Sequence, residues 1–227
     1  MRQNLNLFSA LRAAFPADLD STAIDVADGP SAGSRYSWRD LDQGSARLAN
    51  LLASLALPDG ARVAVQLDKS VESLMLYLAV LRAGYVYLPL NIAYQASEVE
   101  YFLGNAEPSV VVCTDKNLAW IAPMAQRLGV PQVFTLDDDR TGSLLAQASD
   151  CSKVHTPVAR GRDDLAAILY TSGTTGRSKG AMLSHGNLLS NAEVLKDYWD
   201  WREGDVLIHA LPIFHAHGLF VASHGAL

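Results

Sequence analysis

Apolar positions recur along this chain of 227 residues with a spacing that alternates between that of helices and that of buried strands. Over residues 40–55 the leucines fall on one side of a helical repeat, which predicts an amphipathic helix. Ser70 precedes a second apolar run of the same period, and Gly84 follows it. Ser is a favoured N-cap and Gly a favoured helix terminator, so a helix is predicted between them.

Short, continuous apolar runs separate the predicted helices and are typical of strands buried on both faces. They cover residues 62–67, 86–90, 109–114, 133–136, 165–170 and 206–211, and residues 36–38 form a short extended segment. Further helices are predicted at 97–105, 118–128 and 185–199. Residues 137–162 are polar and predict a surface connection with one short helix near Leu144. The alternation predicts an α/β fold with a mostly parallel sheet flanked by helices.

The composition narrows the class of protein. With 49% hydrophobic and 19% charged residues, the chain is typical of a globular enzyme. A net charge of -6 argues against a nucleic-acid partner. Cys113 sits in an apolar run and is expected in the core, and the two cysteines form no disulfide framework. No signal-peptide pattern or membrane-length apolar stretch is visible, so a cytoplasmic protein without a membrane span is predicted.

The densest chemistry lies in the glycine-rich sequence of residues 170–180, YTSGTTGRSKG, which follows a predicted strand. Four hydroxyls, several glycines and one lysine can form a cradle for phosphate groups. The spacing fits neither a Walker A loop, because Lys179 stands three residues after Gly176, nor a dinucleotide fingerprint. A plain surface turn rich in Ser, Thr and Gly is the alternative interpretation. An exposed loop over residues 171–180 is expected.

This segment resembles the phosphate-binding signature of the adenylate-forming superfamily, which includes acyl-CoA synthetases, luciferases and peptide-synthetase adenylation domains. That signature usually has proline where this chain has Ser178. The resemblance implies that ATP phosphates bind to Thr171, Ser172, Gly173, Thr174, Thr175, Gly176 and Lys179. It also implies Mg²⁺ bridging the phosphate oxygens, with Thr175 as a weak candidate contact.

Two further segments resemble this superfamily in order and spacing. Residues 80–91 resemble an early core motif and are interpreted as structural. Residues 211–219 resemble a motif that lines the acyl pocket, which implies a pocket role for His215, His217 and Gly218, with His215 the stronger candidate. The two histidines lack a carboxylate or cysteine cluster that would favour zinc. His209, on a predicted strand, is interpreted as a core histidine, and Arg177 faces either solvent or phosphate.

The amino-acid sequence of residues 69–79, 164–170 and 205–212 most resembles that of malonyl-CoA synthetases. The resemblance implies activation of a short acid such as malonate by ATP, then transfer to coenzyme A, with release of AMP and pyrophosphate. The alternatives are another acyl-CoA synthetase, an adenylation domain that loads a carrier protein, and a truncated product without catalysis. No residue of this chain is assigned as catalytic.

The superfamily is longer than this chain. The resemblance implies that residues 1–227 are the N-terminal part of the large ATP- and acyl-binding domain. The small C-terminal lid domain, which carries a catalytic lysine in the superfamily, has no counterpart here. The expectation is therefore that residues 1–227 alone are inactive and end within a helix.

Overall fold

A sheet of mostly parallel strands forms the centre of the protein. The computed structural model describes residues 4–171 and 177–227. In that part, six strands are ordered β6-β5-β3-β4-β7-β8, and every neighbouring pair is parallel except β7 and β8. The strands are β3 (Arg62–Gln66), β4 (Val86–Pro89), β5 (Val110–Cys113), β6 (Gln132–Thr135), β7 (Leu165–Thr171) and β8 (Lys179–Ser184). The predicted fold class is confirmed.

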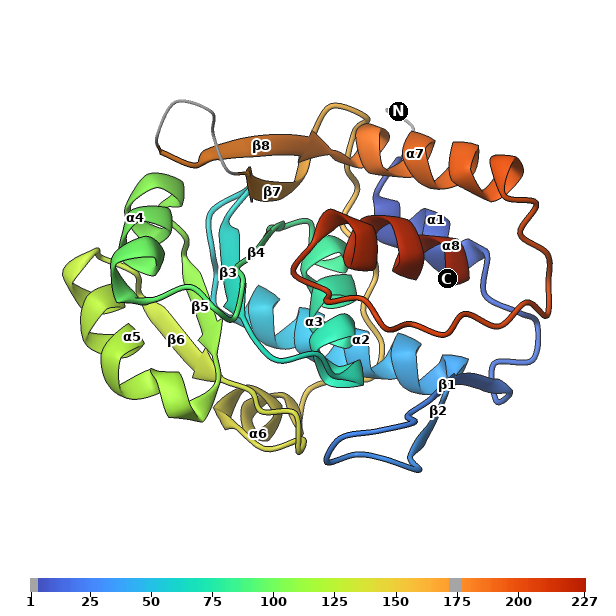
Figure 1. Cartoon of the computed structure of the whole chain (residues 1–227), viewed down its shortest axis with the longest axis horizontal. Helices are drawn as coiled ribbons and strands as arrows, with labels where there is room; N and C mark the ends of the chain where they lie inside the picture. The colour runs from blue at the N-terminus through green and yellow to red at the C-terminus, as the bar shows by residue number, and fades with distance from the viewer. Residues whose placement is uncertain (1–3, 172–176) are drawn as a thin grey trace.

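Helices cover both faces of this sheet (Figure 1). Helices α4 (Ala96–Ala106) and α5 (Asp115–Arg127) pack on one face, and α2 (Trp38–Ser54) and α3 (Val71–Arg82) pack on the other. Strand β3 serves both cores, because Val63 and Val65 belong to one apolar cluster and Ala64 to the other. The remaining helical elements are α1 (Leu7–Ala13), α6 (Ser143–Ala148), α7 (His185–Tyr198), the π-helical η1 (His217–Ser223) and α8 (His224–Ala226).

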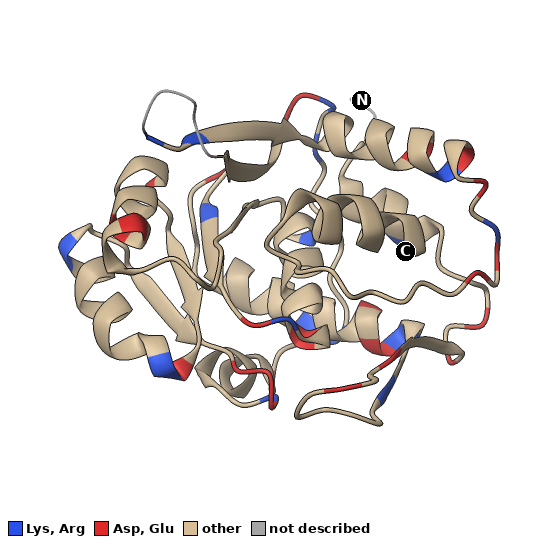
Figure 2. Cartoon of the chain, in the orientation of Figure 1, with Lys and Arg blue, Asp and Glu red and all other residues tan. Residues whose placement is uncertain are grey.

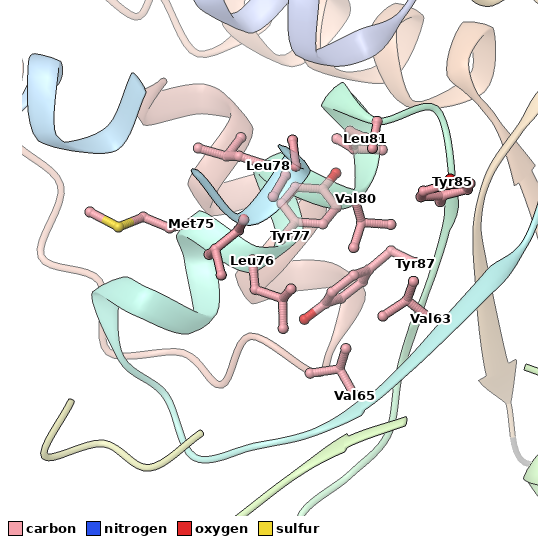
Figure 3. Close-up of a cluster of buried hydrophobic side chains, with 14 of the residues drawn as sticks. Val63, Val65, Met75, Leu76, Tyr77, Leu78, Val80, Leu81, Tyr85 and Tyr87 are labelled. Carbon is pink, nitrogen blue, oxygen red and sulfur yellow. The ribbon is translucent and has the colours of Figure 1, made fainter. Parts of the chain in front are cut away.

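Helix α3 is the most deeply buried of the described helices, with every residue except Leu74 buried. Ser70 caps it as predicted, since its hydroxyl accepts from the Ser73 N–H. Tyr77 of α3 meets Tyr87 of β4 edge-on, with ring centroids 5.0 Å apart (Figure 3). The turn that follows α3 needs Gly84, whose φ of 75° lies in the left-handed region. The predicted buried role of Cys113 is also confirmed.

The N-terminal region contains two elements that the sequence pattern did not predict, helix α1 and strand β1 (Thr22–Asp25). Strand β2 (Arg35–Ser37) corresponds to the predicted extended segment at 36–38 and pairs antiparallel with β1 ahead of α2. Asn6 caps α1, and its side-chain amide donates to the carbonyls of Leu81 at 2.8 Å and Val158 at 2.7 Å. The start of the chain is thus fastened to the end of α3 and to the connection before β7.

One predicted strand is wrong. Residues 206–211 are extended but unpaired in the described structure, and Val206 and Ile208 are 89% and 91% exposed. An apolar, alternating sequence becomes a strand only when a neighbour satisfies its backbone groups, and none of the described strands lies beside it.

The predicted loop over residues 171–180 is also too long. Thr171 ends β7, while Lys179 and Gly180 begin β8, a strand that was missed. The predicted surface connection over 137–162 is present and carries α6. Across residues 4–171 and 177–227, no helix combines the length and apolar character needed to cross a membrane.

Candidate functional site

The β7–β8 hairpin carries both ends of the glycine-rich sequence. Thr171 pairs with Lys179 across the hairpin, and Tyr170 pairs with Gly180. Thr171 and Lys179 are both exposed, so the hydroxyl and the ammonium group can reach a solvent-borne anion. A Cβ atom on Gly180 would lie 2.9 Å from Cγ2 of Ile168, so this position allows the two strands to pack closely.

Helix α4 supports both strands of the hairpin. The Tyr170 hydroxyl donates to Oδ1 of Asn105 at 2.5 Å, and the Tyr101 hydroxyl donates to the Ser178 carbonyl at 2.8 Å. Burial, and secondarily Tyr101, raises the pKa of Tyr170, so its hydroxyl remains a donor. Sequence reasoning missed Tyr101 and Asn105. Their spacing of four residues, which places them on one helix face, is the only local signal.

Five of the predicted phosphate ligands, Ser172, Gly173, Thr174, Thr175 and Gly176, lie outside the described residues, as does the candidate magnesium contact at Thr175. Arg177, just beyond them, is exposed, and its guanidinium lies over the Tyr101 ring at 5.6 Å. The phosphate cradle therefore remains a prediction, with its two described members, Thr171 and Lys179, paired at the loop end of the hairpin.

The second motif, residues 211–219, leads into η1. Gly218 is buried, and a Cβ atom there would lie only 2.1 Å from the Pro212 carbonyl oxygen, so the motif requires glycine at this point. His215 and His217 are both exposed. His209 is not on a strand, contrary to prediction. Its Nε2 lies 2.9 Å from the Gly218 carbonyl and 3.2 Å from the Ser223 hydroxyl, so it ties the extended segment to η1.

A buried polar pair fixes the far end of η1 on the core. Nε2 of His224 lies 2.7 Å from the Tyr77 hydroxyl of α3, and the two rings are stacked. Burial lowers the pKa of His224 to about 3, so the ring is neutral at ordinary pH. Sequence reasoning missed this pair, because nothing local distinguishes Tyr77 from the other apolar residues of α3.

The cavity beside this motif is too small to hold a carboxylic acid. A cavity of about 10 Å³ lies under Ile213 and Phe214, against Ser73 and Tyr87. That volume corresponds to about one water molecule. No hydrogen bond among the described residues joins His215 or His217 to the hairpin, and no group of three or more metal-ligating side chains occurs in this part of the chain.

A parallel sheet, an exposed hairpin and a glycine-rich sequence are typical of enzymes that bind nucleotides. The chain belongs to the AMP-binding enzyme family, whose model matches residues 12–227. Among solved structures, ATP-bound MatB from Rhodopseudomonas palustris is 52% identical with a TM-score of 0.91. The match covers 97% of this chain and 43% of that one.

Curated relatives agree with this assignment. The mitochondrial malonate–CoA ligase of Bos taurus is 31% identical over 198 residues, which are 82% of this chain and 32% of that protein. The oxalate–CoA ligase of Arabidopsis thaliana is 32% identical over 174 residues, 75% of this chain and 34% of that protein. The chain thus spans about a third of the length of these relatives.

Proposed function

We propose that the protein carrying this chain is an AMP-forming acid–CoA ligase that activates malonate or a close relative. The observation that carries the proposal is the match to MatB over 97% of the chain at 52% identity. Similarity to malonate–CoA ligases of two mammals supports malonate as the acid. The oxalate–CoA ligase match supports a short dicarboxylate more broadly and makes oxalate the second candidate.

In this proposal the acid carboxylate attacks the α-phosphate of ATP, which gives an acyl-adenylate and pyrophosphate. The thiol of coenzyme A then attacks the acyl carbon, which forms the thioester and releases AMP. Neither step needs a protein nucleophile, so positioning and neutralisation of phosphate charge are the main requirements.

Lys179 and Thr171 are the described residues best suited to that task. They face each other across β7 and β8 at the point where the glycine-rich sequence begins and ends. The ammonium group of Lys179 supplies a fixed positive charge, and Thr171 supplies a hydroxyl donor. Tyr101 and Asn105 hold the two strands against α4 and so limit how far these side chains move.

Mg²⁺ enters this proposal through the phosphate oxygens, where it would neutralise charge on ATP. Because Mg²⁺ commonly keeps water ligands and binds substrate phosphates, a site built from protein carboxylates is not required. The hydroxyls of the glycine-rich sequence suit this arrangement better than the exposed histidines His215 and His217.

His215, His217 and Gly218 are proposed to line the acid or adenylate side of the site. The support is that Gly218, inside η1, permits the tight approach of the Pro212 carbonyl and so fixes the start of η1, where the exposed His217 lies. A cytoplasmic location also remains a proposal, because the bovine relative is named as mitochondrial. Fractionation of cells that express the natural-length protein would test it.

The test of the function is acid-dependent exchange of pyrophosphate into ATP by the natural-length protein. We expect malonate to support exchange and thioester formation at least tenfold better than oxalate, as judged by kcat/KM. A long-chain fatty acid is the control for a general acyl-CoA synthetase, and a carrier protein in place of coenzyme A is the control for a carrier-loading domain. Exchange that does not depend on any acid would contradict the proposal.

A further inference from the structure

A second cleft lies away from the β7–β8 hairpin, between the β1–β2 hairpin and the loop after β6, with α2 and the start of α3 as its floor. Its volume of about 400 Å³ falls in the range of sites for small molecules. The β7–β8 hairpin lies at the opposite side of the molecule in Figure 1. The cleft is therefore separate from Thr171 and Lys179 at the ends of those two strands.

The cleft is positive in a protein whose net charge is -6. Its charged lining consists of Arg35, Arg47, Arg140, Lys153, Asp40 and Glu72. Because Arg35 pairs with Asp25 outside this lining, the excess is one positive charge. Figure 2 shows basic and acidic positions meeting around β1, β2 and α2. Among the described residues, neither Arg47 nor Lys153 forms an ion pair with a carboxylate. Arg47 donates to the Ser149 carbonyl, an uncharged partner, so the positive charges of both side chains remain available to an anion.

Glu72 adds a hydrogen-bond acceptor to this positive lining. It is only 5% exposed, and its Oε1 accepts from the Tyr36 hydroxyl at 2.7 Å and lies 3.2 Å from Nε of Arg140. Its other oxygen, Oε2, is buried and has no partner in the described structure. A buried carboxylate oxygen without a donor is costly, so a ligand that brings one would be stabilised here.

Arg140 reaches Glu72 from a backbone conformation that is unusual for its residue type, with φ at 71°. Its guanidinium also lies over the Tyr36 ring at 5.6 Å. Burial and the bond to Glu72 raise the pKa of Tyr36 to about 12, so its hydroxyl stays a donor to Oε1. Because Arg140 already balances the charge of Glu72, Oε2 needs a donor without a further positive charge, which a hydroxyl provides.

We infer that this cleft binds a small phosphorylated compound that bears a hydroxyl group. The phosphate lies against Arg47 and Lys153, and the hydroxyl donates to Oε2 of Glu72. Binding requires no covalent step and is independent of the proposed ligase activity. It differs from binding at the glycine-rich sequence because it does not compete with ATP.

The test is calorimetric titration of the natural-length protein, with the nucleotide site saturated by α,β-methylene-ATP. The probes are glycerol 3-phosphate, inorganic phosphate and glycerol. We expect glycerol 3-phosphate to bind with a Kd of about 1 mM or tighter, and about tenfold more tightly than inorganic phosphate, since one charge-assisted hydrogen bond corresponds to about a tenfold change in Kd. Glycerol alone is expected to show no measurable binding.

Exposed side chains provide variants that fold. Lys153→Ala should weaken binding of glycerol 3-phosphate about tenfold, Lys153→Arg should retain it, and Lys196→Ala on α7 should leave it unchanged. Absence of saturable binding would overturn the inference, and so would equal effects of Lys153→Ala and Lys196→Ala. Equal affinity for glycerol 3-phosphate and inorganic phosphate would overturn the role of Glu72 and indicate an adventitious anion only. Displacement by ATP would assign the binding to the hairpin instead.

Discussion

Helix α3 and the extended segment 206–211 have similarly apolar sequences but opposite environments. Leu76, in the middle of α3, is fully buried, whereas Ile208 is 91% exposed. The difference does not lie in the residues themselves. Helix α3 satisfies its own backbone hydrogen bonds and meets α1, α2 and β4, whereas the extended segment has no strand beside it in the described structure. Apolar character indicates what a segment can bury, and its neighbours determine whether it does so.

Truncation of matched aliphatic side chains gives the largest contrast between the two regions. Leu76→Ala should lower the free energy of unfolding by about 2–5 kcal/mol, because it removes buried contacts and leaves a cavity. Ile208→Ala should change it by less than about 0.5 kcal/mol, as is usual for exposed sites. Urea denaturation of both variants is the measurement. A large loss for Ile208→Ala would mean that this segment is covered in solution.

A second contrast separates the rigid core from the chemistry at the hairpin. Lys179→Ala in the natural-length protein should slow acid-dependent pyrophosphate exchange about 10²–10³-fold, since it removes one positioned charge. The free energy of unfolding should not change, because Lys179 is exposed at the start of β8. Lys196→Ala, also exposed, is the control and should exchange at the wild-type rate. Normal exchange by Lys179→Ala would remove this residue from the site.

Acidification should weaken the core before it affects the exposed motifs. His185 accepts the Leu7 N–H at its Nδ1, and burial, with a smaller contribution from Arg160, lowers the pKa of His185 to about 4. Below pH 6.5 the unfolded chain therefore binds a proton that the folded chain does not. The contribution of neutral His185 to the free energy of unfolding is fully present above that pH. It falls by about 1.4 kcal/mol per pH unit down to pH 4.

The measurement for this third contrast is urea denaturation at pH 7.0, 6.0 and 5.0. His224, with its still lower pKa, adds a similar loss. His185→Gln should therefore retain about half of the wild-type dependence on pH. His217→Gln, at an exposed position, should retain all of it. Equal dependence in wild type and His185→Gln would contradict the assignment.

The smallest expected effect concerns the support that α4 gives to the hairpin. Tyr101→Phe removes the hydrogen bond to the Ser178 carbonyl. One such bond is worth about 0.5–1.5 kcal/mol, so the KM for ATP should rise about two- to tenfold while kcat changes little. Tyr198→Phe, at an 80% exposed tyrosine of α7, is the matched control. Steady-state kinetics with malonate would distinguish the two variants.

Most of the central sheet and its helices could be predicted from the sequence, because their apolar spacing and end residues are local signals. Ser70, the apolar run of α3 and Gly84 specify one helix with its two ends. Strand β8 could not be predicted in this way. Its sequence, KGAMLS, is partly exposed along its length and becomes a strand only through its pairing with β7.

In the candidate site, too, some residues could be predicted from local sequence and others could not. Thr171 and Lys179 could be selected from a contiguous motif. Tyr101 and Asn105 act through contacts between segments 77 and 65 residues apart in the sequence, which no local pattern reveals. His209 contacts Gly218, nine residues away, but only because the chain folds back there without forming a strand. The incorrect strand at 206–211 shows the opposite error, in which local pattern was taken as sufficient without a partner for the backbone.

The hydrogen bonds that hold Asn6 and Leu7 have a consequence for the synthesis of the protein on the ribosome. Asn6 binds the Val158 carbonyl, and the Leu7 N–H binds His185, across separations of 152 and 178 residues. At a translation rate of about 5–20 residues per second, α1 waits roughly 10–35 s after its own synthesis before His185 is made. During that interval Leu7, Phe8 and Leu11, which are buried in the finished fold, lack part of their final environment. Helix α1 is thus synthesised well before its partner on α7, and nascent chains are expected to depend on chaperones at this helix during that interval.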